Sequence, residues 1–211
     1  ALGNSAGETS QAASAVAIGP YAGNATQGQG AVAVGYIAGQ TNQGAEAVAV
    51  GYYAGNTSQG VSAVAIGNDA GKTTQGGYAV AIGDAAGVLN QGNNAVAVGL
   101  AAGETTQGRS GIAIGGSAGN TTQGNFAVAI GFSAGYDTQG ISAVAIGDYA
   151  GSTSQGEDSI AIGKEAGETN QAANSIVLNA TGTEVNNTTA SSLVIKPIRS
   201  AVGTTMLMYD V

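Results

Sequence analysis

The sequence repeats with a period of 16 residues along most of its length. Ala15-Val16-Ala17-Ile18-Gly19 returns as Ala31-Val32-Ala33-Val34-Gly35, and the same step leads on to Ile160-Ala161-Ile162-Gly163. The register contains no insertion or deletion, so every unit has the same contour length. A constant period of this size is typical of solenoids, in which each unit buries its apolar surface only against its neighbours.

Glycine occupies three fixed positions of the repeat. One column runs from Gly3 to Gly163, a second from Gly7 to Gly167 and a third from Gly28 to Gly156, and together they hold 31 of the 37 glycines. A glycine that returns at one phase marks a corner that needs a positive φ or leaves no room for a Cβ, whereas scattered glycines are typical of flexible linkers. The glycine content therefore predicts regular corners.

The segments between the corners are predicted to be short strands. In Ala15-Val16-Ala17-Ile18, Ala alternates with the β-formers Val and Ile at the period of a strand. A helix is disfavoured because a glycine interrupts every few residues. Thr57-Ser58-Gln59 and its equivalents predict a second straight piece in each unit. We therefore expect an all-β fold, a parallel β-solenoid of eleven 16-residue coils stacked about 4.8 Å apart, with Val and Ile filling its interior.

One glutamine returns in every coil. Side-chain amides at one phase of a stack can donate and accept along the stack, so we predict a structural amide ladder here in preference to a ligand site. The ladder comprises Gln27, Gln43, Gln59, Gln75, Gln91, Gln107, Gln123, Gln139 and Gln155, with Gln11 and Gln171 at its ends.

A column of alanines is expected on the outer face of the same strands, opposite Val and Ile. A flat strip of small apolar side chains in water favours association with another surface, here copies of the same chain, although alanine could also simply be tolerated on an exposed strand. The predicted interface consists of Ala17, Ala33, Ala49, Ala65, Ala81, Ala97, Ala113, Ala129, Ala145 and Ala161.

The composition excludes several kinds of site. Without Cys or His the chain has neither thiolates nor the commonest metal ligand, and we expect no metal and no cofactor. Thirteen acidic residues against five dispersed basic ones give a formal charge of −8, which disfavours nucleic acid as a partner. No run of about 20 apolar residues is present, so no membrane contact is expected in this segment.

The repeat resembles the head repeats of trimeric autotransporter adhesins. Residues 14–19, 62–67 and 142–147 each read Ser-Ala-Val-Ala-Ile-Gly, which is similar to the family's signature, and the likeness extends over about residues 1–178. The resemblance implies a left-handed parallel β-roll, three chains side by side as a homotrimer, and attachment to a host-surface protein or glycan. The units of that family are commonly shorter and less uniform, and the Ala-Gly-x-Thr-x-Gln-Gly half of this unit is not its usual sequence.

Similar repeats also occur in virus and phage tail fibre proteins. Residues 192–199 and 203–210 look like the stretch that precedes the self-cleaving chaperone domain of such fibres. The resemblance therefore implies an extracellular location, either on a bacterial cell surface or in a virion fibre.

The repeat decays after Gln171, where Asn179 replaces the corner glycine. We therefore divide the chain into a solenoid over residues 1–178 and a cap or transition segment over residues 179–211. In the second segment, Leu193 to Ile195 and Met206 to Met208 could form a β-hairpin around Gly203.

The variable residues define two ridges. The first ridge is the pair that follows each corner glycine after the Val-Ala-Val strand, and the second ridge is the pair that follows Gln-Gly. On the first ridge, Tyr21, Tyr36, Tyr52 and Tyr53 fall in adjacent rows and are candidate ligand-binding residues, because stacked tyrosines offer a large contact area at low entropy cost. The alternative is that they seal a subunit interface or cover a corner.

The sequence shows no cluster of nucleophile, base and orienting group, so we expect no enzyme activity. The expected function is a structural and attachment segment of a fibre. Ice binding is the alternative, because Thr fills one column from Thr9 to Thr169, although Ala25, Leu89 and Asp137 interrupt the file.

Overall fold

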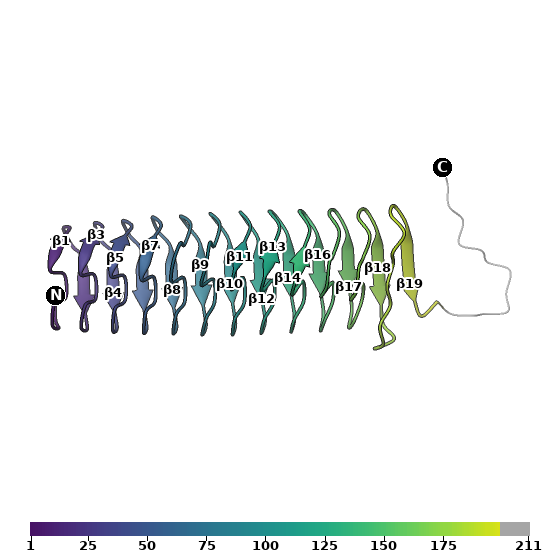
Figure 1. The fold of residues 1–211 in the computed structure, drawn as a ribbon, viewed down its shortest axis with the longest axis horizontal. Helices are drawn as coiled ribbons and strands as arrows, with labels where there is room; N and C mark the ends of the chain where they lie inside the picture. Colours follow the sequence, from purple (N-terminus) through teal and green to yellow (C-terminus); the bar gives the residue numbers. More distant parts are fainter. Residues whose placement is uncertain (199–211) are drawn as a thin grey trace.

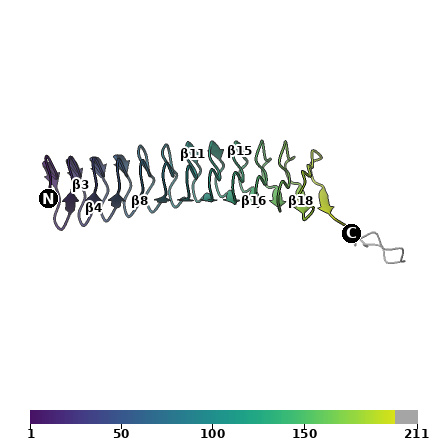
Figure 2. The ribbon, with the colours of Figure 1, turned by 90° about the horizontal axis from the view of Figure 1, so that it is seen from below.

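The computed structural model describes residues 1–198, which form a straight rod of stacked coils (Figure 1). These residues are all-β, with no helix, and the coils follow one another as a parallel β-solenoid. Strands of a large sheet line one side of the rod and shorter strands line the opposite side (Figure 2). The predicted fold class is therefore confirmed as a parallel β-solenoid.

The large sheet contains twelve strands within the described residues, one from each turn of the solenoid. All pairs are parallel, and their register advances by one repeat per turn, as in Val64↔Val80 and Ala65↔Ala81. Its strands are β2 (Val16–Ile18), β4 (Val32–Val34), β6 (Val48–Val50), β8 (Val64–Ile66), β9 (Val80–Ile82), β10 (Val96–Val98), β12 (Ile112–Ile114), β14 (Val128–Ile130), β16 (Val144–Ile146), β17 (Ile160–Ile162), β18 (Ile176–Asn179) and β19 (Leu193–Lys196).

The opposite side is built from the Thr-x-Gln segments, as predicted. Single bridges such as Gln59↔Gln75 and Gln139↔Gln155 continue this column between its regular strands. Its strands are β1 (Thr9–Gln11), β3 (Ala25–Gln27), β5 (Thr41–Gln43), β7 (Thr57–Gln59), β11 (Thr106–Gln107), β13 (Thr122–Gln123) and β15 (Thr138–Gln139).

The large-sheet strands face the opposite way to our expectation. From β2 to β17 the middle alanine of each strand is fully buried, whereas Val and Ile point outward, and in β18 the buried middle residue is Val177. The prediction of an outward alanine column was therefore wrong for Ala17, Ala33, Ala49, Ala65, Ala81, Ala97, Ala113, Ala129, Ala145 and Ala161, all of which have no exposed surface.

The physical reason for this reversal is lack of space. The glutamine side chain crosses the interior from the opposite side, and a Cβ built on Gly71 would lie 2.8 Å from Gln75 Oε1 and 3.1 Å from the Cβ of Ala65. Only alanine-sized side chains fit between the two sides, so the larger Val and Ile must lie outside.

The glutamine column forms the amide ladder that the sequence suggests. Gln75 is typical: its Nε2 donates to Gln91 Oε1 at 3.1 Å and to the Val64 carbonyl at 2.7 Å, and its Oε1 accepts from Gln59 Nε2 at 3.1 Å. Each amide therefore joins its own coil to the next one and also joins the two sides of the tube. The hydrogen bond between side chains is missing from Gln27 to Gln43 and from Gln107 to Gln123. Gln43 Oε1 and Gln123 Oε1 therefore have no donor among the described residues.

The glycine columns lie where the sequence predicts, at positions that have a positive φ or no space for a Cβ. Gly19 has a φ of 119°, and a Cβ there would lie 2.5 Å from the Gly35 carbonyl oxygen. Gly28 has no positive φ, but its Cβ would lie 2.5 Å from the Ala45 nitrogen. Each position therefore excludes a side chain because the neighbouring coil approaches so closely.

Each corner also holds a residue that is usually not glycine in the left-handed conformation. Tyr53 and Ala85 both have a φ of 55°. Their amides donate to the preceding coil, Tyr53 N to Tyr36 O at 3.0 Å and Ala85 N to Asn68 O at 2.9 Å. These hydrogen bonds between coils help to hold a conformation that costs an L-residue about 1–2 kcal/mol.

The solenoid extends beyond the predicted boundary at residue 178. Strand β19 pairs in parallel with β18, from Ile176↔Leu193 to Asn179↔Lys196, so the step of this last turn is 17 residues instead of 16. Asn179 replaces the corner glycine, and its Nδ2 donates to the carbonyls of Lys164 and Thr183 at 2.7 and 2.6 Å. Leu193 to Ile195 are thus part of a further coil, whereas Met206 to Met208 lie outside the described residues.

Replacing Gln75 by Leu should destabilise the rod by about 2–4 kcal/mol, because the Val64 carbonyl and the amides of Gln59 and Gln91 lose buried partners. Thermal unfolding followed by circular dichroism, with hydrogen exchange to locate the loss, measures this. Thr74→Ser, at the exposed neighbouring position, is the matched control. Equal stability of Gln75→Leu and the control would contradict a structural ladder.

Replacing Ala85 by Gly should stabilise the rod by about 0.5–1 kcal/mol, because glycine has no Cβ penalty at positive φ. The control is Ala45→Gly, at a corner position without positive φ, where the greater freedom of the unfolded chain should lower stability slightly. Melting temperatures of the two variants should move in opposite directions. A loss of stability in both would show that the left-handed corner is not strained.

Candidate functional site

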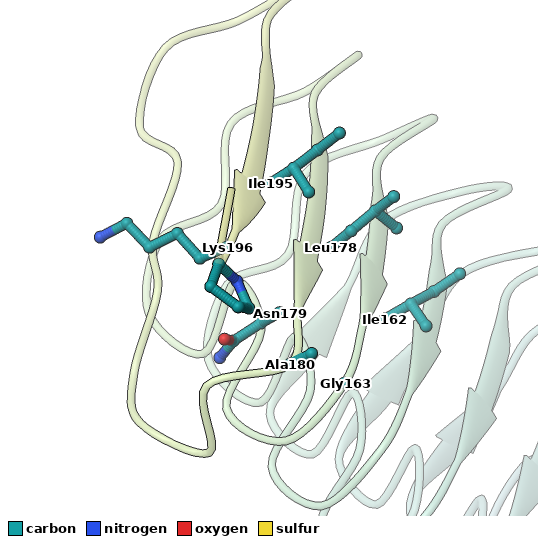
Figure 3. Close-up of a pocket in the computed structure, with 8 residues that line it drawn as sticks. Ile162, Gly163, Leu178, Asn179, Ala180, Ile195 and Lys196 are labelled. Atoms are coloured by element: carbon teal, nitrogen blue, oxygen red, sulfur yellow. The ribbon is translucent and has the colours of Figure 1, made fainter. Parts of the chain in front are cut away.

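The outer face of the large sheet is a continuous apolar surface, which we call the valine face. It consists of the two outward residues of every strand, and neither of its columns contains a charged residue. Ile18 is 42% exposed, and Ile162, Leu178 and Ile195 lie in one row at the far end of the rod (Figure 3). Its members are Val16, Ile18, Val32, Val34, Val48, Val50, Val64, Ile66, Val80, Ile82, Val96, Val98, Ile112, Ile114, Val128, Ile130, Val144, Ile146, Ile160, Ile162, Ile176, Leu178, Leu193 and Ile195.

The area of the valine face is much larger than that of a single apolar side chain on a protein surface. Twelve strands at a spacing of about 4.8 Å and a width of three residues give roughly 500 Å² in projection. A contiguous apolar patch of several hundred Å² is often a functional surface. The apolar strip on the outer side of the sheet is therefore made of Val and Ile instead of the Ala that we predicted.

The four predicted tyrosines come together on the first ridge. Tyr36 and Tyr52 stack with ring centroids 5.4 Å apart and planes 15° apart. Tyr53 contacts Tyr52 edge to face at 4.5 Å, and Tyr21 contacts Tyr36 at 6.3 Å. The coil spacing produces this stack, because residues one repeat apart lie directly above one another. We call these four side chains the tyrosine patch.

A pair of opposite charges borders the tyrosine patch. Lys72 Nζ lies 5.1 Å from the Tyr53 ring centroid and 3.0 Å from Asp69 Oδ1. Desolvation by the neighbouring side chains, with a further contribution from Tyr53, raises the pKa of Tyr52 above its usual value. The patch therefore offers aromatic rings, phenol hydroxyls and one ion pair, a combination suited to a sugar or a protein surface.

Sequence reasoning did not single out several other exposed side chains. Phe132 and Tyr149 contact each other edge to face at 5.5 Å on the first ridge, and Arg109 lies 5.1 Å from the Phe126 ring on the second ridge. The regular repeat was sufficient to place these residues in rows, but only the exposed fractions show that they project from the rod.

The threonine file lies on the side opposite the valine face. Thr41 and Thr57 are half-buried, and their neighbours Asn42 and Ser58 are exposed. The file remains interrupted at Ala25, Leu89 and Asp137 in the structure as in the sequence.

The described residues also contain an acidic cluster near their C-terminal end. Partial burial raises the pKa of Glu168, and the nearby Glu184 and Glu165 raise it further. No group of three or more His, Cys, Asp or Glu within residues 1–198 could hold a metal ion. A shallow hollow of about 360 Å³ beside Ile162, Leu178 and Ile195 is an edge of the valine face (Figure 3).

We compared the chain with models of protein families, with curated proteins and with solved structures, and nothing matches it. No helix in the described part of the chain has the length and apolar character needed to span a membrane. The valine face and the tyrosine patch therefore remain the features from which a function can be argued.

Proposed function

We propose that this chain is a rigid, self-associating segment of an extracellular fibre that presents an attachment surface, and that its assembly is a homotrimer. The observation that carries the proposal is the valine face, which exposes two Val, Ile or Leu side chains on every turn of the described solenoid. Three such faces turned toward a common axis would remove this surface from water.

Copies of the same chain are the partner that best fits the valine face. The face is flat, straight and periodic at the spacing of the coils, so a partner that covers all of it needs the same length and period. A second β-solenoid of this sequence has both properties. Three copies, and a left-handed coil, agree with the resemblance to trimeric autotransporter adhesins.

Attachment is assigned to the tyrosine patch, with a host-surface protein or glycan as the partner. At the level of these tyrosines, the second ridge carries small or polar residues, among them Gly30, Ala45 and Glu46. The patch is therefore not matched by an apolar ridge at its own height, which favours an open surface over a sealed seam. The resemblance to adhesins and fibres supports an extracellular location, on a bacterial surface or a virion.

Sedimentation equilibrium should give a solution mass near three times the 20.1 kDa chain. Ile66→Asp with Ile82→Asp should shift this mass to that of the monomer, because association would bury unpaired charges. The control, Thr74→Asp with Asn90→Asp, adds the same charge at exposed positions on the opposite side. A monomeric mass for the wild-type protein would contradict the trimer proposal. A clear thermal hysteresis of that monomer would then favour ice binding.

Replacing Tyr36, Tyr52 and Tyr53 together by Ser should weaken binding to immobilised glycans or matrix proteins at least tenfold, because the patch loses most of its aromatic contact area. Surface binding to an array of both ligand kinds measures this, and unchanged circular dichroism controls for folding. Tyr78→Ser, which removes an exposed tyrosine from the second ridge, should leave binding intact. Full binding by the triple variant would exclude the patch.

A further inference from the structure

Two neighbouring turns carry exposed apolar side chains at both ends of their large-sheet strand. Phe126 precedes β14 and Phe132 follows it, with exposures of 48% and 53%. Ile141 precedes β16 and Tyr149 follows it, with exposures of 45% and 38%. Together with the outward residues of β14 and β16, these four side chains form an apolar band across the whole width of the sheet, which we call the belt.

The belt is confined to these two turns of the described solenoid. Near β4 and β6 the aromatic residues lie only on the first ridge, and near β8 and β9 the exposed Val61 and Tyr78 lie only on the second ridge. Opposite them, at the other end of the same strands, lie Asp69 and Asp84. Within the described residues, both ridges therefore carry a large exposed apolar side chain at the same height only at β14 and β16.

The valine face cannot by itself align one copy with another. Its rows are nearly identical in every turn, so a slip by one coil, about 4.8 Å, buries almost the same side chains. A unique alignment must come from residues that do not repeat, and those residues lie on the ridges.

A ring of parallel copies brings unlike ridges together. When each copy turns its sheet toward a common axis, the edge that carries the first ridge of one copy meets the edge that carries the second ridge of the next, which is a head-to-tail interface that closes into a ring. Without a slip, residues that flank the same strand then face each other across each seam.

We propose that the belt is a contact between the ridges of neighbouring copies of this chain and that it fixes their axial register. In this arrangement Phe132 of one copy meets Phe126 of the next, and Tyr149 meets Ile141. This inference rests on the proposed homotrimer and adds to it the surface that selects one alignment among many.

Charges on the ridges agree with the same alignment. Lys164 follows β17 on the first ridge, where it also pairs with Glu165 of its own chain at 3.2 Å, and Glu157 and Asp158 precede β17 on the second ridge. Lys164 therefore faces acidic groups when the copies are in register, which a slip by one coil would disrupt.

Arg109, on the second ridge, does not face an acidic residue in this alignment. No acidic residue follows β12 on the first ridge, where Gly116 and Ser117 lie. Instead, its guanidinium lies against the Phe126 ring of its own chain, beside the belt. The proposed register therefore leaves this charge at the seam with an aromatic partner.

The test is disulfide trapping with Phe126→Cys and Phe132→Cys in one chain, which has no cysteine of its own. The three extended residues of β14 lie between these positions and hold them roughly 10 Å or more apart, beyond the Cα separation of a disulfide, so the two cysteines cannot form a bridge within one chain. Under mild oxidation, most of the protein should run as a covalent trimer on a denaturing gel. Each single variant should remain uncrosslinked.

A mismatched pair and a second matched pair make the result specific. Phe126→Cys with Leu100→Cys joins levels two turns apart and should give no trimer. Asp158→Cys with Lys164→Cys flanks β17 and should crosslink even if changes in the belt impair packing. A trimeric mass without crosslinks in either matched pair, or with efficient crosslinks in the mismatched pair, would overturn the proposed register but not the trimer. A monomeric mass would overturn the proposed function itself.

Discussion

The buried glutamine is the interaction on which the other features of this solenoid depend. Its amide bonds along the rod to the next coil and across the rod to the large sheet, as Gln59 does with Gln75 and the Val48 carbonyl. A fully buried amide is tolerated only when its donors are satisfied, so each coil must present a carbonyl at the same place as the coil before it. This requirement explains why the repeat keeps a constant length over so many turns.

The glutamine also decides what the surface looks like. Because it occupies the interior, the sheet buries only alanine from β2 to β17, and the larger apolar residues of these strands are forced to the outside. In most folds an outward row of Val and Ile would be a liability, whereas here it is a consequence of how narrow the tube is. The proposed assembly of three chains is the arrangement that would return these side chains to a dry environment.

Repetition made much of this structure predictable from the sequence. The phase of Gly19 and Gly28 located the corners, and the recurrence of Gln75 located the ladder, because equal phases must stack. The orientation of Ala65 and Ile66 was mispredicted, because alternation gives two faces but not which one is inner, and the rule that larger apolar residues are buried fails in so narrow a tube. The coil at Leu193 was missed because its step is one residue longer and Asn179 stands in for glycine.

The tyrosine patch shows which contacts the columns of the repeat predict and which they do not. Adjacent rows placed Tyr36 beside Tyr52, and the rings do stack, but columns alone do not reveal that Lys72 turns back over Tyr53. The belt was missed for a related reason. Phe126 and Phe132 belong to different columns, and their common height emerges only when the chain is viewed as strands with two ends.

The hydrogen bonds between coils all run along the rod, which makes the two gaps in the amide ladder mechanically significant. A fibre under tension loads its coil junctions in series, so its strength is that of the junction with the fewest bonds. The junctions between Gln27 and Gln43 and between Gln107 and Gln123 lack the side-chain bond that most others have. These two junctions would therefore yield to tension more readily than the neighbouring junctions that keep the ladder bond.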